Sequence, residues 1–179
     1  MELKGSKTEK NLWEAFAGES MARNKYTYFS KKAKKEGYNL IGDVFEQTAH
    51  NEEEHAKVWF KLLQGGDIQD TATNLQICVD GENYEYTDMY VRMAEDAKEE
   101  GFTRIAYLFE AIGKIEKGHE ERYKKVLDAL KENRIFSRDT KVVWECAECG
   151  NRIEGLTPPE ICPICSHPKA YFFELREVY

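Results

Sequence analysis

Hydrophobic residues recur in steps of three and four from about residue 8 to about residue 133, which is the spacing of amphipathic helices. Glycines interrupt this pattern where a helix would end. The four predicted helices span approximately residues 12–37, 41–62, 75–101 and 105–130. We expect Gly37 to follow the C-cap of the first helix and Thr103 to be the N-cap of the fourth.

The lengths of the connections predict how these helices are arranged. Short turns follow the first and third helices, and a longer stretch, about residues 65–74, joins the second to the third. This pattern indicates two antiparallel hairpins joined by a crossover, as in a ferritin-like four-helix bundle. The fold class is therefore predicted to be mainly α.

The pattern changes after a connector at about residues 134–141. From residue 142 onward the segments are short, aromatic and interrupted by proline and glycine. A region of this size cannot rely on an apolar core and needs a staple such as a metal ion. We predict a bundle domain at 1–136 and, with its linker, a small metal-stapled domain of strands and loops at 137–179.

An internal repeat carries the chemistry of the helical part. The segment from Ala33 to Glu46 recurs from Ala97 to Glu110, and each copy leads six residues later into Glu-x-x-His. The glutamates and the histidines of the two copies are each separated by 64 positions. A further glutamate precedes each copy. The resulting ligands are Glu19, Glu52 and His55 in one copy, and Glu82, Glu116 and His119 in the other. A Glu followed by Glu-x-x-His, repeated twice, is the ligand set of a di-iron or di-manganese bundle.

Glu85 joins these residues on the apolar stripes of their helices, so that five carboxylates are expected in one interior. A lone helical glutamate usually faces solvent, but burying one unpaired carboxylate costs several kcal/mol. Total stability is only about 5–15 kcal/mol. The only basic candidates nearby are Arg23 and Arg92, whose positions on the stripe are ambiguous. Two metal ions would neutralise the negative charge of the five carboxylates better than these arginines. Mixed carboxylate and imidazole ligands favour iron or manganese over structural zinc.

Two features of this site leave alternatives open. Glu85 lies one turn after Glu82 and is surplus to the minimal ligand set. By hypothesis it competes with His55 for one iron. Ferric iron would favour the carboxylate of Glu85, and ferrous iron would accept the imidazole of His55. Tyr26 and Tyr90 either donate hydrogen bonds to ligand carboxylates or simply pack as aromatic residues.

Four of the five cysteines form two C-x-x-C pairs, Cys146 with Cys149 and Cys162 with Cys165, with twelve residues between the pairs. This spacing strongly indicates a metal site but leaves open whether it holds zinc or a single iron. Aromatic residues around the cysteines could shield the sulfurs. The fifth cysteine, Cys78, is expected to be a buried packing residue.

Net charge and hydropathy exclude several partners. A net charge of −7 argues against nucleic acid and anionic membranes, which select basic surfaces. We see no transmembrane stretch and no apolar signal region at the charged start, so a cytoplasmic location is expected.

Together these residues resemble rubrerythrin, a ferritin-like di-iron domain fused to a rubredoxin-like domain. The likeness rests on Ala17-Gly-Glu-Ser20, on Glu52-Glu-Glu-His55, on the segment Gly81–Tyr90, on Glu116-Lys-Gly-His119 and on both cysteine pairs. It implies a peroxidase that reduces hydrogen peroxide to water with electrons ultimately from NAD(P)H. It also implies a head-to-tail homodimer in which the rubredoxin-like iron of one subunit serves the di-iron site of the other.

The resemblance also implies roles for the ligands. Glu52 and Glu116 would bridge the irons, Glu19 would be terminal on one iron, where Glu85 and His55 exchange, and the second iron would be held by Glu82 and His119. Because no G-x-G-x-x-G fingerprint is present, NAD(P)H is expected to act through a separate reductase or a rubredoxin. The rival readings are a ferroxidase or iron-sequestering protein, and a pure electron carrier.

Overall fold

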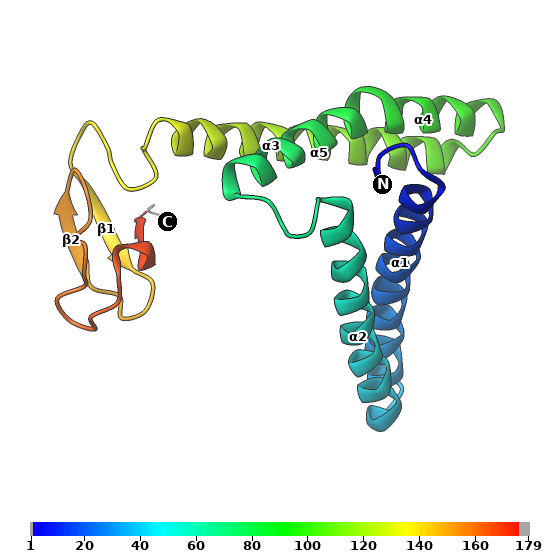
Figure 1. Ribbon diagram of the computed structural model, residues 1–179, viewed down its shortest axis with the longest axis horizontal. Helices are drawn as coiled ribbons and strands as arrows, with labels where there is room; N and C mark the ends of the chain where they lie inside the picture. The colour runs from blue at the N-terminus through cyan, green and yellow to red at the C-terminus, as the bar shows by residue number, and fades with distance from the viewer. Residues whose placement is uncertain (1, 176–179) are drawn as a thin grey trace. The chain divides into compact units, whose positions relative to one another are not determined.

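The computed structural model describes residues 2–175 and divides into two compact units, one ending at Asp70 and the other beginning at Thr71. The first unit is a helical hairpin of α1 (Lys7–Lys35) and α2 (Asn39–Leu63), which pack along each other (Figure 1). The second unit contains a second helical hairpin and a small sheet. Its helical elements are α3 (Thr71–Tyr84), the π-helix η1 (Glu85–Met89), α4 (Tyr90–Glu99) and α5 (Thr103–Lys131). The four helical segments expected of a ferritin-like bundle are thus present.

Both hairpins turn in the same way. After α1, the amide of Gly37 donates to the carbonyl of Lys34 and the amide of Tyr38 donates to the carbonyl of Ala33. Gly101 and Phe102 make the matching bonds after α4. Gly37 and Gly101 have φ values of +88° and +84°, where a side chain would be strained. The prediction for Gly37 is confirmed.

The predicted N-cap of the last helix is wrong. Phe102 occupies the N-cap position without a side-chain hydrogen bond, and Thr103 is the first helical residue. The helix begins one residue earlier than expected because the amide of Ala106 donates to the carbonyl of Phe102, which makes Phe102 the first acceptor of the helix.

The third predicted helix is not continuous. It begins at Thr71, earlier than the apolar stripe suggests, and is interrupted by η1 before it resumes as α4. A π-helix widens one turn to hold an additional residue, and such turns are often found at functional sites. The cause is one additional residue that the second hairpin has and the first lacks.

The small C-terminal part, residues 142–175, is here called the cysteine module. Its sheet has the order β2-β1-β3, in which β1 (Val142–Cys146) pairs antiparallel with β2 (Arg152–Gly155) and with β3 (Phe172–Glu174). A short 3-10 helix, η2 (Lys169–Tyr171), precedes β3. The module has its own buried cluster of Trp144, Cys146, Cys162 and Phe172.

The end of the connector packs on the cysteine module. The backbone amide of Arg138 donates to the carbonyl of Leu156, and its guanidinium lies over the ring of Trp144 and pairs with Glu174. The indole of Trp144 donates to the carbonyl of Gly155. These bonds attach Arg138 to the sheet, whereas the exact domain boundary at 136/137 stays a prediction.

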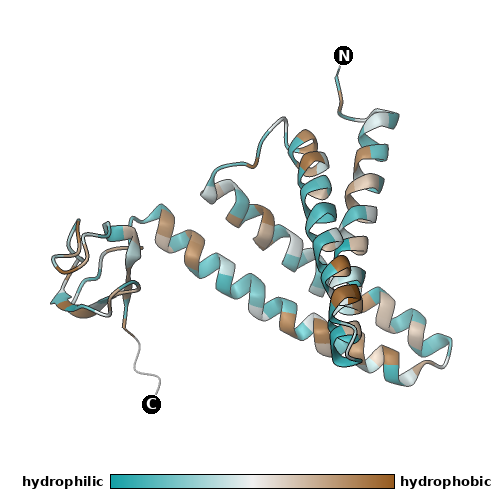
Figure 2. Cartoon of the chain, turned by 90° about the horizontal axis from the view of Figure 1, so that it is seen from below, coloured by the Kyte–Doolittle hydropathy of each residue, from teal (hydrophilic) through white to brown (hydrophobic). Residues whose placement is uncertain are grey.

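The helical hairpins bury mainly small residues, with Val79, Leu127 and Glu120 as the larger exceptions in the second hairpin. Ala33, Ala49 and Ala56 are buried in the first unit, and among the described residues the largest fully buried side chains are all in the cysteine module. Large apolar side chains such as Trp13 and Ile115 are about half exposed within their own units. Figure 2 shows hydrophobic positions recurring between hydrophilic ones along the helices. Two packed helices share one narrow line of contact, so each hairpin leaves most of its apolar surface uncovered.

The two glycines inside α5 differ in their surroundings. A Cβ added at Gly113 would approach the Cβ of Tyr90 to 3.3 Å, whereas one added at Gly118 would meet nothing within 4 Å. Gly118→Ala is therefore expected to stabilise the metal-free protein by about 1 kcal/mol through helix propensity. Gly113→Ala should gain less or lose stability, because Tyr90 must shift. Urea unfolding followed by far-UV circular dichroism measures both; equal gains would contradict the difference.

Candidate metal centres

The two hairpins place the predicted ligands in the same relative positions. Residues three apart on a helix lie on one face, so the Glu-x-x-His motif of α2 presents Glu52 and His55 together, and α1 contributes Glu19. We call these three residues the first half-site. The second half-site consists of Glu82 from α3 with Glu116 and His119 from α5. In each half-site, one ligand atom per residue can be chosen so that all lie within 4.8 Å of one another.

The distances within the half-sites repeat as the sequence does. In the first, Nδ1 of His55 lies 3.0 Å from Oε2 of Glu52 and 3.8 Å from Oε2 of Glu19. In the second, Nδ1 of His119 lies 2.6 Å from Oε2 of Glu116 and 3.6 Å from Oε2 of Glu82. The duplication is therefore seen both in the Glu-x-x-His sequence motif and in the positions of the donor atoms.

The carboxylates of each half-site disturb each other's protonation. A hydrogen bond between Glu19 and Glu52 raises the pKa of Glu19 and lowers that of Glu52, so Glu19 is the one of the two that takes up a proton first as pH falls. Desolvation, and then the charge of Glu116, raise the pKa of Glu82. Both arrangements penalise the fully ionised state, and a bound cation removes that penalty.

Neither hairpin alone supplies the dry interior predicted from the sequence. The side chains of Glu52 and Glu116 are 17% and 14% exposed, but that of His55 is 57% exposed. The four acidic ligands lie on the partly covered face of each hairpin and not on its polar surface. Their burial together in one interior stays a prediction.

Glu85 lies outside both half-sites. It is the first residue of η1, and its charge contributes to the raised pKa values of Tyr90 and Glu82. It therefore lies close to the second half-site without joining the cluster of donor atoms.

The π-helix marks where the two repeats differ in length. Glu82 follows Glu19 by 63 positions, whereas Tyr90 follows Tyr26 by 64, so the second hairpin has one additional residue between these landmarks. The structure accommodates it in η1, while α1 is continuous. Sequence reasoning missed the π-helix, although the change in offset from 63 to 64 was a signal that could have revealed it.

The aromatic residues near the half-sites have different surroundings. Desolvation and the charge of Glu85 raise the pKa of Tyr90, so its hydroxyl stays protonated and able to donate to a carboxylate. Tyr26 stacks on Phe45. The sequence analysis missed Trp59. Its indole N–H is buried and makes no hydrogen bond of normal geometry among the described residues. It nevertheless lies close enough to Glu19 to lower the pKa of that carboxyl. The roles of Tyr26 and Tyr90 stay predictions.

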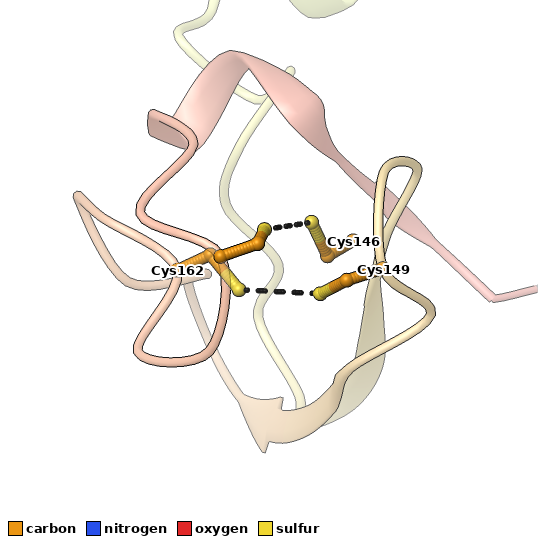
Figure 3. Close-up of side chains that lie close together, drawn as sticks. Cys146, Cys149 and Cys162 are labelled. Carbon is orange, nitrogen blue, oxygen red and sulfur yellow. Dashed lines mark hydrogen bonds between the residues drawn. The ribbon is translucent and has the colours of Figure 1, made fainter.

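The four cysteines of the module converge on one point (Figure 3). The Sγ atoms of Cys146 and Cys165 are 3.7 Å apart, and so are those of Cys149 and Cys162. A tetrahedral site with metal–sulfur distances of about 2.3 Å has sulfur–sulfur edges of about 3.8 Å, whereas a disulfide requires about 2.05 Å. The geometry fits a metal ion and excludes disulfides among these four residues.

The two cysteine pairs are built as similar knuckles. Gly150 donates its amide to the carbonyl of Cys146, and Ser166 donates to that of Cys162, each from a backbone with positive φ. Desolvation raises the pKa of the Cys162 thiol, but the backbone amides of Cys165 and Ile164 outweigh it and bring that pKa to about 6. The His167 amide acts to lower the pKa of Cys165, but desolvation and the other cysteines raise it to about 12. One thiolate is therefore favoured without metal, and a cation is needed to hold all four.

Cys78 lies on α3 outside this cluster and is partly buried, not fully buried as expected.

The raised pKa of Glu82 gives a prediction for stability. A carboxyl whose pKa is higher in the folded protein destabilises the fold where it is ionised. Glu82→Gln should therefore raise the melting temperature of the metal-free protein at pH 7, and the gain should shrink as pH falls through the pKa of Glu82. Thermal unfolding at a series of pH values measures this. A gain independent of pH would exclude charge as its cause.

The cysteine geometry gives a second prediction. Cys162→Ser should remove about one metal ion per chain and abolish the near-UV circular dichroism of Trp144, while the helical far-UV signal persists, because the staple belongs to the module alone. Cys78→Ser is the matched control and should change neither signal. Retention of the metal after Cys162→Ser would contradict the four-sulfur site.

Comparisons with known proteins match the helical part and the cysteine module separately. The rubrerythrin family model matches residues 10–127, and the model of the rubredoxin-like domain of rubrerythrin matches residues 144–173. The chain is 47% identical to rubrerythrin of Nitratidesulfovibrio vulgaris over 95% of each chain. It is 45% identical to rubrerythrin-1 of Clostridium acetobutylicum over 99% of this chain and 98% of that protein.

A solved structure of nigerythrin in a mixed-valence state is 31% identical and covers 97% of this chain and 91% of its own, with a TM-score of 0.36.

Both half-sites lie within the first matched segment and all four cysteines within the second. The predicted cofactors, a di-iron site in the helical part and a mononuclear rubredoxin-type site at the cysteines, are confirmed at that level. With both metal-binding parts present and relatives that match almost from end to end, the chain belongs to the rubrerythrin family.

Proposed function

We propose that this protein is a peroxidase that reduces hydrogen peroxide to water at a di-iron carboxylate site, with electrons delivered through the cysteine module. The observation that carries this proposal is the presence of two chemically different metal sites in one chain: duplicated Glu and Glu-x-x-His ligands, and four converging thiolates. The first set suits a site that binds and reduces a small oxidant, and the second suits one-electron transfer. Each peroxide consumes two electrons and two protons and yields two waters.

A dinuclear centre of this kind takes four glutamates and two histidines, which is the number that one first and one second half-site offer. Glu52 and Glu116 are the proposed bridging carboxylates, because each is the least exposed ligand of its half-site. Glu19 and Glu82 are the terminal carboxylates, while His55 and His119 supply the imidazoles. Glu85 remains the alternative to His55. When bound, iron supplies the electrons and the Lewis acidity that cleave the O–O bond.

The protein's own groups neutralise charge and manage protons. The pKa of Glu19 is raised beside Glu52, so protons compete with a cation for this pair and metal affinity should fall at acidic pH. Tyr90 stays protonated at neutral pH because desolvation and nearby carboxylates raise its pKa. It can therefore donate a hydrogen bond to one of those carboxylates throughout turnover.

The electron source is proposed to be a separate protein. The sequence has no dinucleotide fingerprint, so NAD(P)H would act through a reductase or a rubredoxin that meets the cysteine module. A head-to-tail homodimer is proposed as the assembly.

No helix among the described residues is long and apolar enough to cross a membrane.

Rapid mixing of the reduced, iron-loaded protein with peroxide tests the proposal. Both iron centres should be oxidised within the mixing experiment, and Glu52→Ala should slow oxidation of the di-iron site by more than about 100-fold, since even the loss of a ligand's hydrogen-bond partner costs about 10- to 100-fold. Glu54→Ala is the matched control, because Glu54 lies on the same helix but is exposed and pairs with Lys57. Slow oxidation that ignores Glu52→Ala would contradict the proposal.

Iron storage is the second candidate, because ferritin-like sites also oxidise ferrous iron. The two functions differ in their need for the cysteines. In a peroxidase, Cys162→Ser should permit one round of peroxide reduction but abolish repeated turnover with a reductase. In a storage protein, the cysteines should be dispensable and many irons should remain bound per chain.

A further inference from the structure

Glu120 is a buried acidic residue that the proposed metal centre does not use. It follows His119 on α5, and its side chain is only 4% exposed. Among the described residues, it and Ser30 are the only polar side chains in the buried class. A buried carboxylate is costly unless it is fully paired, so its partners indicate what it does.

Three side chains donate to this carboxylate. Oε1 of Glu120 accepts from Nζ of Lys124 at 2.6 Å and from Nδ2 of Asn83 at 2.9 Å. Oε2 accepts from the hydroxyl of Tyr86 at 3.3 Å. Lys124 belongs to the same helix, whereas Asn83 and Tyr86 belong to α3 and η1. The carboxylate therefore ties α5 to the chain on both sides of the point where the α-helix becomes a π-helix.

The tied residues adjoin the proposed ligands. Asn83 follows Glu82, Tyr86 follows Glu85, and Glu120 follows His119. The hydroxyl of Thr87 also donates to the carbonyl of Asn83 at 2.6 Å, which satisfies a carbonyl at the start of the widened turn. The network thus fixes the backbone next to Glu82, Glu85 and His119 without contacting their donor atoms.

The first hairpin has no equivalent of this network. Ser20 stands where the second hairpin has Asn83, and the buried Ala56 stands where it has Glu120. The corresponding segment of α1 is an ordinary α-helix. The buried network and the π-helix therefore occur together in one repeat and are absent together from the other.

Packing on the far side of η1 explains why the extra residue stays in place. Tyr90 lies against Gly113 of α5, and Ala94 and Ala97 are buried. Returning η1 to an α-helix would turn one flank by about 100° relative to the other, since an α-helix has 3.6 residues per turn. Either Tyr86 would leave Glu120, or Tyr90 would leave α5. Anchors on both sides hold the additional residue in a π-helical turn.

We propose that Glu120 is a positioning residue: through Asn83 and Tyr86 it holds η1 in its π-helical form, and so fixes the position of Glu85, the first residue of η1. This inference rests on the part of the proposed function that makes Glu85 an iron ligand. Glu120 itself does not touch the metal.

A double-mutant cycle on iron binding tests whether Glu120 acts through Glu85. The protein carries zinc at the cysteines. Ferrous iron is loaded into the carboxylate sites and oxidised with ferricyanide, and competition with a chelator then measures the affinity for ferric iron, the state that the Glu85 carboxylate favours. Glu120→Gln should weaken binding about tenfold in the native background, the size typical of a lost outer contact. In a Glu85→Gln background it should weaken binding less than about twofold, because the group it positions is gone. Equal losses in both backgrounds would overturn the proposal.

Amide hydrogen exchange of the metal-free protein gives an independent readout. Amides of residues 85–90 should exchange about tenfold faster in Glu120→Gln, and also in Tyr86→Phe, a milder variant that removes only the hydroxyl. Tyr84→Phe is the matched control, since Tyr84 is 52% exposed and outside the network. Unchanged exchange in Tyr86→Phe and Glu120→Gln would show that the network does not hold η1.

Neither measurement uses peroxide, so the two proposals fail separately. If the unmodified protein does not reduce peroxide but the cycle is non-additive, only the proposed function falls. If peroxide is reduced but the losses are additive, Glu120 has no positioning role.

Discussion

Two ionised carboxylates that lie side by side repel each other, and the repulsion is relieved when one of them takes up a proton or when a metal ion binds between them. The hydrogen bond to Glu52 raises the pKa of Glu19, and desolvation and then the charge of Glu116 raise the pKa of Glu82. Each hairpin therefore holds acidic side chains in a form that a cation improves. Metal binding, proton release and folding stability are consequently linked in the helical part of this protein.

The helical part and the cysteine module are stabilised in different ways. Each hairpin relies on tight turns, buried alanines and ion pairs such as those that Lys34 makes with Asp43 and Glu46. The module instead surrounds its four cysteines with Trp144 and Phe172 and anchors the connector through Arg138. Loss of iron from the helical site should therefore leave the module folded, whereas loss of the metal at the cysteines removes the centre of its core.

Features that the two hairpins share could be predicted from the sequence, whereas features found in only one place were missed. Helical periodicity and the glycine after α1 were sufficient for the hairpins, and the Glu-x-x-His spacing was sufficient for the half-sites. The π-helix was missed because one added residue hardly changes an apolar stripe. Glu120 was missed because its burial depends on Asn83 and Tyr86, 37 and 34 residues away. Trp59 was read only as part of the stripe, since sequence does not reveal a buried donor without a partner.

The asymmetry between the two halves comes from a few changes in one repeat: the inserted residue in η1, the carboxylate of Glu85, and Asn83 and Glu120 in place of Ser20 and Ala56. A hypothetical chain with two copies of the first hairpin would have four glutamates and two histidines in a symmetric set, with no fifth carboxylate and no buried Asn–Glu–Tyr network. Its two metal ions would be chemically equivalent by construction. These changes break that equivalence, so the protein can give its two irons different affinities and different potentials while using the same hairpin twice.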